Sequence, residues 1–122
     1  MSELQRILDA LSAIRISAQP EEAEIHREIA RALDAAQIGY IHECPLSPGR
    51  RIDFACGGIG IEVKKGRPVA ARLRAQLQRY LEDERLAAVI VVLQKPCALP
   101  EHICGKPVRV VSLNRLWGVA LP

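Results

Sequence analysis

Residues 87–93, with the sequence AAVIVVL, form the segment that most limits how this chain can fold. A continuous apolar run of this length, rich in Val and Ile, is typical of a β-strand that is covered on both faces. The chain has 122 residues, 49% of them hydrophobic, which suits one domain with a sizeable core. We therefore predict a single α/β domain over residues 1–122.

Helical and strand-like patterns alternate along the chain. Apolar residues at helical spacing predict helices over residues 2–16, 20–37 and 68–84. Strand patterns lie over residues 40–46, 51–56, 59–65, 87–93 and 108–113, with a long loop over 93–107. The order is α-α-β-β-β-α-β-β, which we divide into an accessory N-terminal helix (1–18), a core (20–93) and a C-terminal loop and strand (94–122).

Charge and cysteine content narrow the class of protein. The longest apolar run is too short to span a membrane, and the N-terminal segment carries charges where a signal peptide needs an apolar block. The four cysteines lack CxxC spacing, so we expect reduced thiols and a cytoplasmic protein.

The net charge is +3, and residues 64–79 hold six basic residues and no acid. Such a run indicates either a solvated helix face or a surface for nucleic acid.

The stretch RIDFACGGIGIEVKKG, residues 51–66, reads as a β-hairpin with Gly57-Gly58 as its turn. A two-residue turn there places Asp53 opposite Glu62. Strand alternation then predicts one apolar face, made of Ile52, Phe54, Cys56, Ile59, Ile61 and Val63. The other face holds Arg51, Asp53, Ala55, Gly60, Glu62 and Lys64, and its two small residues, Ala55 and Gly60, are expected to leave open space beside the acids.

Two carboxylates placed directly opposite each other repel, so a positive charge must offset them. A divalent cation bridging Asp53 and Glu62 is one answer, since hard cations take oxygen ligands. Lys64, on the same face, could orient a water or neutralise charge on a phosphate. The alternative is that the acids form simple ion pairs with Arg51 and Lys64 on a solvated face.

The spacing D-x8-E-x-K on a hairpin, in this order of elements, resembles the PD-(D/E)xK nuclease superfamily over about residues 20–93. Ile52 stands where the family motif often has Pro. The resemblance implies a restriction-endonuclease-like αβββαβ core with a mixed central sheet flanked by helices. It also implies Mg²⁺ or Mn²⁺ held by Asp53, Glu62 and the Val63 carbonyl, with Lys64 positioning the nucleophile.

The first core helix of the family often adds a glutamate to the site. Here Glu22-x-x-Ile25-His26-x-x-Ile29 resembles the corresponding pattern of some small members. Helical spacing puts Glu22 on the face that covers the sheet, and Glu24 is the second choice. Either acid could instead complement the helix dipole.

The next helix carries Gln76 and Tyr80, which match the Q-x-x-x-Y motif of RecB-type and lambda-exonuclease-type members. The resemblance implies that they hold the substrate strand. The alternative is a tyrosine half-buried beside neighbouring leucines. Lys65, Arg72 and Arg79 are candidate contacts to DNA phosphates.

These features predict a metal-dependent deoxyribonuclease. Alternatives are a Holliday-junction resolvase-type homodimer and a non-catalytic or partner-dependent subunit of a larger repair or restriction complex. Residues 2–16 could supply a dimer contact or pack on their own domain. The remaining candidates are weaker. A zinc site at Cys97, His102 and Cys104 lacks a fourth ligand. His26 and His42 are expected at the surface or in helix packing, and Trp117 is expected in the core or in a subunit contact.

Overall fold

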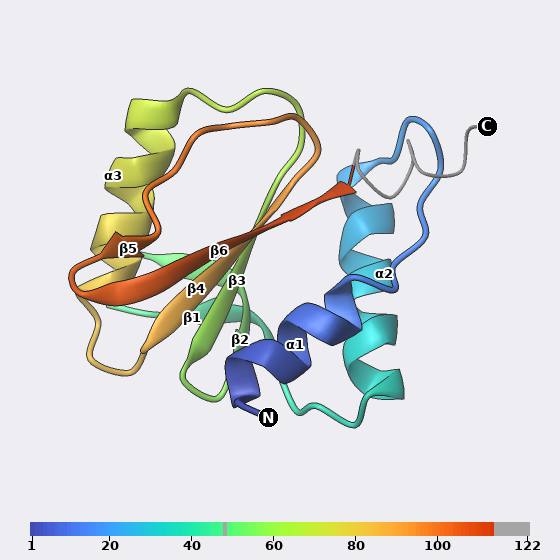
Figure 1. The fold of residues 1–122 in the computed structure, drawn as a ribbon, viewed down its shortest axis with the longest axis horizontal. Helices are drawn as coiled ribbons and strands as arrows, with labels where there is room; N and C mark the ends of the chain where they lie inside the picture. Colours follow the sequence, from blue (N-terminus) through green and yellow to red (C-terminus); the bar gives the residue numbers. More distant parts are fainter. Residues whose placement is uncertain (48, 114–122) are drawn as a thin grey trace.

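Six strands form one mixed sheet, with helices on both of its faces (Figure 1). The computed structural model describes residues 1–47 and 49–113. The helices are α1 (Glu3–Leu11), α2 (Glu22–Ala35) and α3 (Ala70–Leu81). The strands are β1 (Ile41–Pro45), β2 (Arg51–Cys56), β3 (Ile59–Lys64), β4 (Ala88–Leu93), β5 (His102–Ile103) and β6 (Lys106–Ser112), in the sheet order β1-β2-β3-β4-β6-β5.

Strand β4 runs through the middle of the sheet, parallel to β3 on one side and to β6 on the other. Every residue of β4 is buried, as its continuous apolar sequence predicts. Helix α3 makes the crossover from β3 to β4 that a parallel pair requires. The first three strands are antiparallel, so the sheet is mixed.

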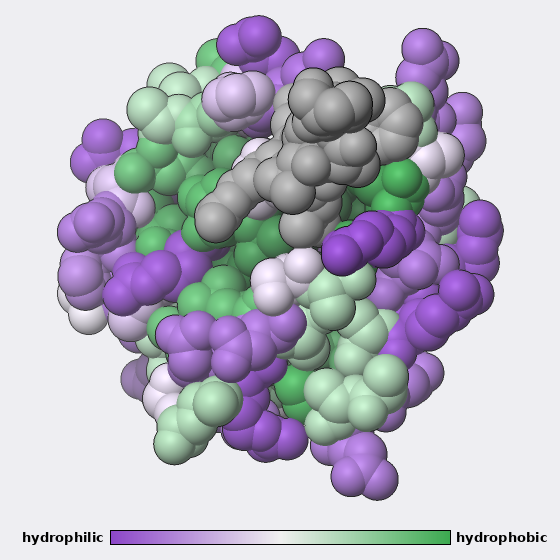
Figure 2. Space-filling view, turned by 45° about the vertical axis from the view of Figure 1, so that its right-hand side comes forward, coloured by the Kyte–Doolittle hydropathy of each residue, from purple (hydrophilic) through white to green (hydrophobic). Residues whose placement is uncertain are grey.

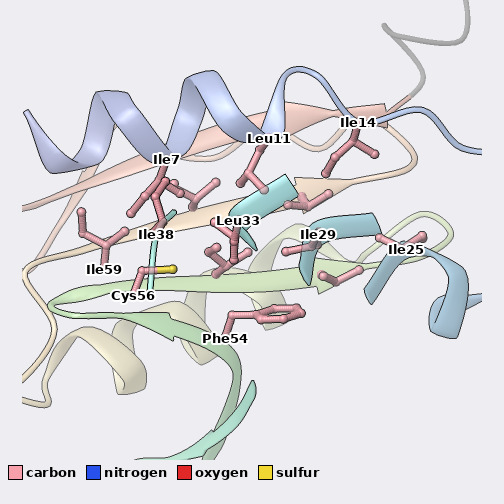
Figure 3. Close-up of a cluster of buried hydrophobic side chains, with 14 of the residues drawn as sticks. Ile7, Leu11, Ile14, Ile25, Ile29, Leu33, Ile38, Phe54, Cys56 and Ile59 are labelled. Atoms are coloured by element: carbon pink, nitrogen blue, oxygen red, sulfur yellow. The ribbon is translucent and has the colours of Figure 1, made fainter. Parts of the chain in front are cut away.

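Helices α1 and α2 cover one face of the sheet (Figure 3). Their buried side chains point onto residues of β2 and β3, as the close-up shows. Ser2 caps α1, because the Gln5 N–H donates to its Oγ at 3.1 Å. Helix α1 ends at Leu11, earlier than predicted, although Ile14 is still buried. The N-terminal helix therefore packs on its own domain, one of the two predicted alternatives.

Helix α3 covers the opposite face. Its apolar stripe packs against residues of β2 and β4 in a second cluster; the helix contributes Leu73, Leu77, Tyr80 and Leu81. The surface outside these interfaces is largely polar. Figure 2, which turns the α1–α2 side forward, shows hydrophilic side chains along the edges of this face and patches of hydrophobic ones between them.

Three details differ from the sequence-based prediction or lie beyond the structure. Helix α2 begins at Glu22, two residues after the predicted start. The predicted loop 93–107 contains the short strand β5, which pairs with β6. Trp117 lies outside the described residues. Within the described ranges, no helix has the length and apolar character needed to cross a membrane.

Candidate active site

The β2–β3 hairpin opens where its two acids lie. The register follows the predicted two-residue turn, and its last described pair is Phe54 with Ile61. At the next position, Asp53 and Glu62, hydrogen bonds of the side chains replace the backbone pairing. The Val63 N–H donates to Asp53 Oδ2 at 2.8 Å, and the Asp53 N–H donates to Glu62 Oε1 at 3.4 Å. The acids are neighbours, as predicted, yet each bonds the opposite backbone where a regular ladder would pair them.

Strand β2 also changes sides at this point. Ile52 packs on the α3 face together with Ala55, whereas Phe54 and Cys56 pack on the α2 face. The prediction that Ile52 shares the face of Phe54 is therefore wrong. Regular alternation fails at Asp53, because Ile52 and Phe54, which are two positions apart, lie on opposite faces.

The neighbouring strand β1 is distorted at the same level. Glu43 stands opposite Asp53 in the register, and its φ is +57°. The other two described non-glycine residues with positive φ have ordinary explanations, since Gln37 follows the end of α2 and Cys104 lies in the β5–β6 turn. A left-handed residue within a strand costs about 1–3 kcal/mol, and such strain often accompanies a functional site.

The predicted open space beside the acids is absent at Gly60. A Cβ atom on Gly60 would overlap Ile52 Cδ1 and would lie 3.4 Å from Leu86 Cδ1. Ala55 is also buried. Because β2 changes sides at Asp53, the Ile52 side chain lies over Gly60 and fills the space that the sequence predicts to be open.

Glu62 is the one buried charged residue in residues 1–47 and 49–113, with 5% of its surface exposed. Burial, followed by the nearby Asp53 carboxylate, raises the pKa of Glu62 to about 7. Lys64 opposes this shift, because its Nζ lies 3.3 Å from Glu62 Oε2. An ion pair with Lys64 therefore exists, as one alternative predicts, but it is not on a solvated face.

Asp53 also meets helix α2, through a residue whose role the sequence analysis missed. His26 Nε2 lies 3.9 Å from Asp53 Oδ2 and 4.0 Å from Glu22 Oε2. This nitrogen is buried and has no hydrogen-bond partner among the described residues. Burial raises the pKa of Asp53, and the Val63 N–H and His26 act against that shift. The signal available in the sequence was the i, i+4 spacing of Glu22 and His26.

The two candidate glutamates of α2 make different contacts. Glu22 reaches the His26–Asp53 pair, although its side chain is 66% exposed. Glu24 instead accepts hydrogen bonds from the backbone N–H and the hydroxyl of Ser17, at 2.8 and 2.9 Å. These bonds lower the pKa of Glu24. Glu22 is thus the helix acid near the site, and Glu24 holds the chain ahead of α2.

Tyr80 and Gln76 lie on the other side of the hairpin. The Gln76 amide donates to the Tyr80 hydroxyl at 3.0 Å, and that hydroxyl donates to the Arg51 carbonyl at 3.0 Å. Burial and the Glu62 and Asp53 carboxylates raise the pKa of Tyr80, so it stays protonated. The tyrosine is 4% exposed, and its hydroxyl braces β2 beside the acids.

A basic pocket adjoins the site along α3. Lys64, Gln76, Arg72 and Arg79 are among its lining residues, so four of the predicted residues come together there. Lys65 instead pairs with Glu21 at 3.5 Å. Arg51 pairs with Glu43 at 3.5 Å and so does not serve as the predicted partner of Asp53.

All four cysteines are free thiols, as expected. The weaker zinc candidate, made of Cys97, His102 and Cys104, is not among the convergent donor groups of the described residues. Among the residues that the structure describes, one group of three or more His, Cys, Asp or Glu donors lies close enough to hold a metal ion, and it consists of His26, His42 and Glu43.

Comparisons with protein-family models, with curated proteins and with solved structures found no match.

Proposed function

We propose that this protein is a metal-dependent nuclease that hydrolyses phosphodiester bonds in DNA, with the fold and site of the PD-(D/E)xK superfamily. The observation that carries the proposal is the opening of the hairpin at Asp53, beside buried Glu62 and beside a buried His26 nitrogen that has no partner in the described chain. A solvated polar face needs none of these features.

The residues suit a divalent cation. A buried carboxylate beside a part-buried one costs free energy unless a positive charge offsets the pair, and Lys64 supplies a single one. Asp53, Glu62 and the Val63 carbonyl are the proposed oxygen ligands, and His26 Nε2 adds a nitrogen next to Asp53. An imidazole donor favours Mn²⁺ over Mg²⁺. Glu22 supports His26 from the helix.

When bound, Mg²⁺ or Mn²⁺ lowers the pKa of a water molecule and stabilises negative charge on the phosphate. The chain supplies the remaining functions. In this proposal Lys64 positions the attacking water, and Tyr80 keeps β2 in place through the Arg51 carbonyl. Arg72 and Arg79 line the pocket next to Lys64, where they contact the phosphates of the substrate strand.

The test is cleavage of circular, linear, single-stranded and four-way-junction DNA with Mg²⁺, Mn²⁺ or EDTA. Wild type is compared with Asp53→Asn and Lys64→Ala, and Lys95→Ala, an exposed lysine elsewhere, serves as control. We expect metal-dependent cleavage in wild type and Lys95→Ala. We expect at least about a hundredfold loss in both site variants, since each removes a charged group from the reacting centre.

Binding of DNA without cleavage would overturn the proposal if Asp53→Asn left that binding unchanged in every metal. The domain would then be a binding module or a partner-dependent subunit. The preferred substrate distinguishes a junction-cutting enzyme from one that degrades ends.

A further inference from the structure

We infer that His26, His42 and Glu43 form a second metal site, selective for Zn²⁺-like transition metals, which shares His26 with the Asp53–Glu62 centre. The three residues come from α2 and β1, and one donor atom from each lies within 4.8 Å of the others. They also line one pocket, on the α2 side of the sheet. The site is therefore open to ions from solvent.

The two imidazoles face each other as ligands of one ion would. His26 Nδ1 and His42 Nε2 share a hydrogen bond of 2.9 Å, which a bound ion would replace, and His42 Nε2 lies 4.0 Å from Glu43 Oε1. Two ligands of a tetrahedral zinc ion, each about 2.0–2.1 Å from the metal, are separated by roughly 3.3 Å. The two observed distances lie on either side of this value.

Packing holds the rings in this arrangement. The His42 ring stacks on Phe54, with centroids 4.6 Å apart and an interplanar angle of 23°. The His26 side chain is 11% exposed and contacts the same phenylalanine, with ring centroids 5.4 Å apart. The buried His26 ring therefore loses little conformational freedom when it binds an ion, and His42, 47% exposed, is supported on one face by Phe54.

Glu43 provides an independent observation. Its left-handed backbone within β1 is the one described case that no turn or helix end explains. The carboxylate lies between two partners, with Oε2 at 3.5 Å from Arg51 and Oε1 facing His42. One oxygen is thus available to an ion while the other stays on arginine.

The donor types select the metal. Two imidazoles and one carboxylate, with solvent completing the coordination, match zinc sites that have three protein ligands. Mg²⁺ prefers oxygen ligands throughout and competes poorly for such a set. The site therefore differs in selectivity from the carboxylate centre next to it.

Shared use of His26 makes this site regulatory, a consequence that depends on the proposed function. A neutral imidazole has one nitrogen lone pair. When Nδ1 holds a metal, Nε2 carries the proton and faces Asp53 as a donor, so it is no longer a ligand for the catalytic cation. Zn²⁺ at this site is therefore expected to inhibit Mn²⁺-dependent cleavage.

The site itself is tested without any activity assay. Co²⁺ is titrated into the metal-free protein and followed by visible absorption, and Zn²⁺ is then added as competitor. We expect the first equivalent of Co²⁺ to bind at this site and Zn²⁺ to displace it. His42→Ala and Glu43→Gln should each weaken Co²⁺ binding at least about tenfold. His102→Ala, an exposed histidine on β5, should bind as wild type does.

The double variant Asp53→Asn, Glu62→Gln keeps all three proposed ligands and should retain Co²⁺ binding. Four results would overturn the inference: no Co²⁺ binding by wild type, binding unchanged in His42→Ala, loss confined to the Asp53/Glu62 variant, or a thiolate charge-transfer band that places the ion on cysteine. Thermal unfolding confirms that each variant is folded. Because the assay uses no DNA and the nuclease centre does not contain His42 or Glu43, Co²⁺ binding that is unchanged in those two variants would reject this site and leave the nuclease proposal standing, and loss of cleavage does not affect the Co²⁺ result.

Discussion

The two ends of the β2–β3 hairpin differ sharply although the same two strands form both. At the turn end, Cys56 pairs with Ile59 in a regular ladder and the side chains are buried apolar groups. At the open end, the acids bond the opposite backbone, and Glu62 is buried as a charged residue. The regular end stabilises the fold, and the open end costs stability to hold polar groups together. Substitutions should therefore have opposite effects on stability at the two ends.

The largest effect is expected from Ile61→Ala, in the last regular pair. Ile61 is fully buried, so truncation should lower the free energy of unfolding by about 2–5 kcal/mol. Ile41→Ala is the control, because Ile41 is 59% exposed and should change stability by less than about 0.5 kcal/mol. Urea unfolding measures both. Equal losses in the free energy of unfolding for Ile61→Ala and Ile41→Ala would mean that the regular end of the hairpin does not stabilise the fold.

Glu62→Gln should stabilise the protein at high pH. The folded pKa of about 7 exceeds the ordinary value of 4.5, so the folded state binds more protons between these limits and the wild type loses stability as pH rises through them. The variant lacks this loss, which amounts to at most about 3 kcal/mol. Unfolding at pH 4, 6 and 8 should show a gap between variant and wild type that grows with pH.

If the difference in free energy of unfolding between Glu62→Gln and wild type is the same at all three pH values, burial of the Glu62 charge does not cause that difference. The metal gives a second check on the same variant. Added Mn²⁺ should raise the melting temperature of wild type and not that of Glu62→Gln, because the variant lacks one of the proposed carboxylate ligands.

Gly60→Ala should destabilise the fold by about 1–3 kcal/mol, because its Cβ would overlap the Ile52 side chain. The double variant Gly60→Ala, Ile52→Val should recover part of the loss, since it shortens the overlapping group. Thermal unfolding of the single and double variants measures this coupling. No recovery would contradict the packing of Ile52 on the α3 face.

The smallest effect concerns DNA affinity. Arg72→Ala and Arg79→Ala together should reduce the salt dependence of DNA binding by about one unit of slope for each lost phosphate contact. Arg31→Ala, an exposed arginine on α2, is the matched control. Fluorescence anisotropy between low and moderate salt gives the slopes. An equal slope in all three proteins would remove the basic pocket from the proposed DNA path.

Much of the fold could be predicted because its signals are local. The β4 segment is apolar throughout and is buried throughout. The Gly57-Gly58 turn sets the register up to Phe54 and Ile61, since a two-residue turn leaves no choice of pairing nearby. The position of α3 on the face opposite α1 and α2 follows from the crossover it must make.

The site could be predicted only in part. Asp53, Glu62 and Lys64 are close in the hairpin, so their proximity follows from the turn. The sequence predicts only a surface or helix-packing position for His26, because nothing local links it to Asp53. That contact depends on how α2 packs against the sheet, which the residues of neither segment reveal alone.

The sequence by itself determined the α/β class, the buried central strand, the hairpin turn and the nearness of the two acids. Tertiary structure alone decided where the ladder opens, which face Ile52 covers, and which atoms approach Asp53 and Tyr80. The physical reason is the range of the interactions. Alternation and turns act between close neighbours in the chain, whereas the break at Asp53 and Glu43 arises where β1, β2, β3 and α2 meet.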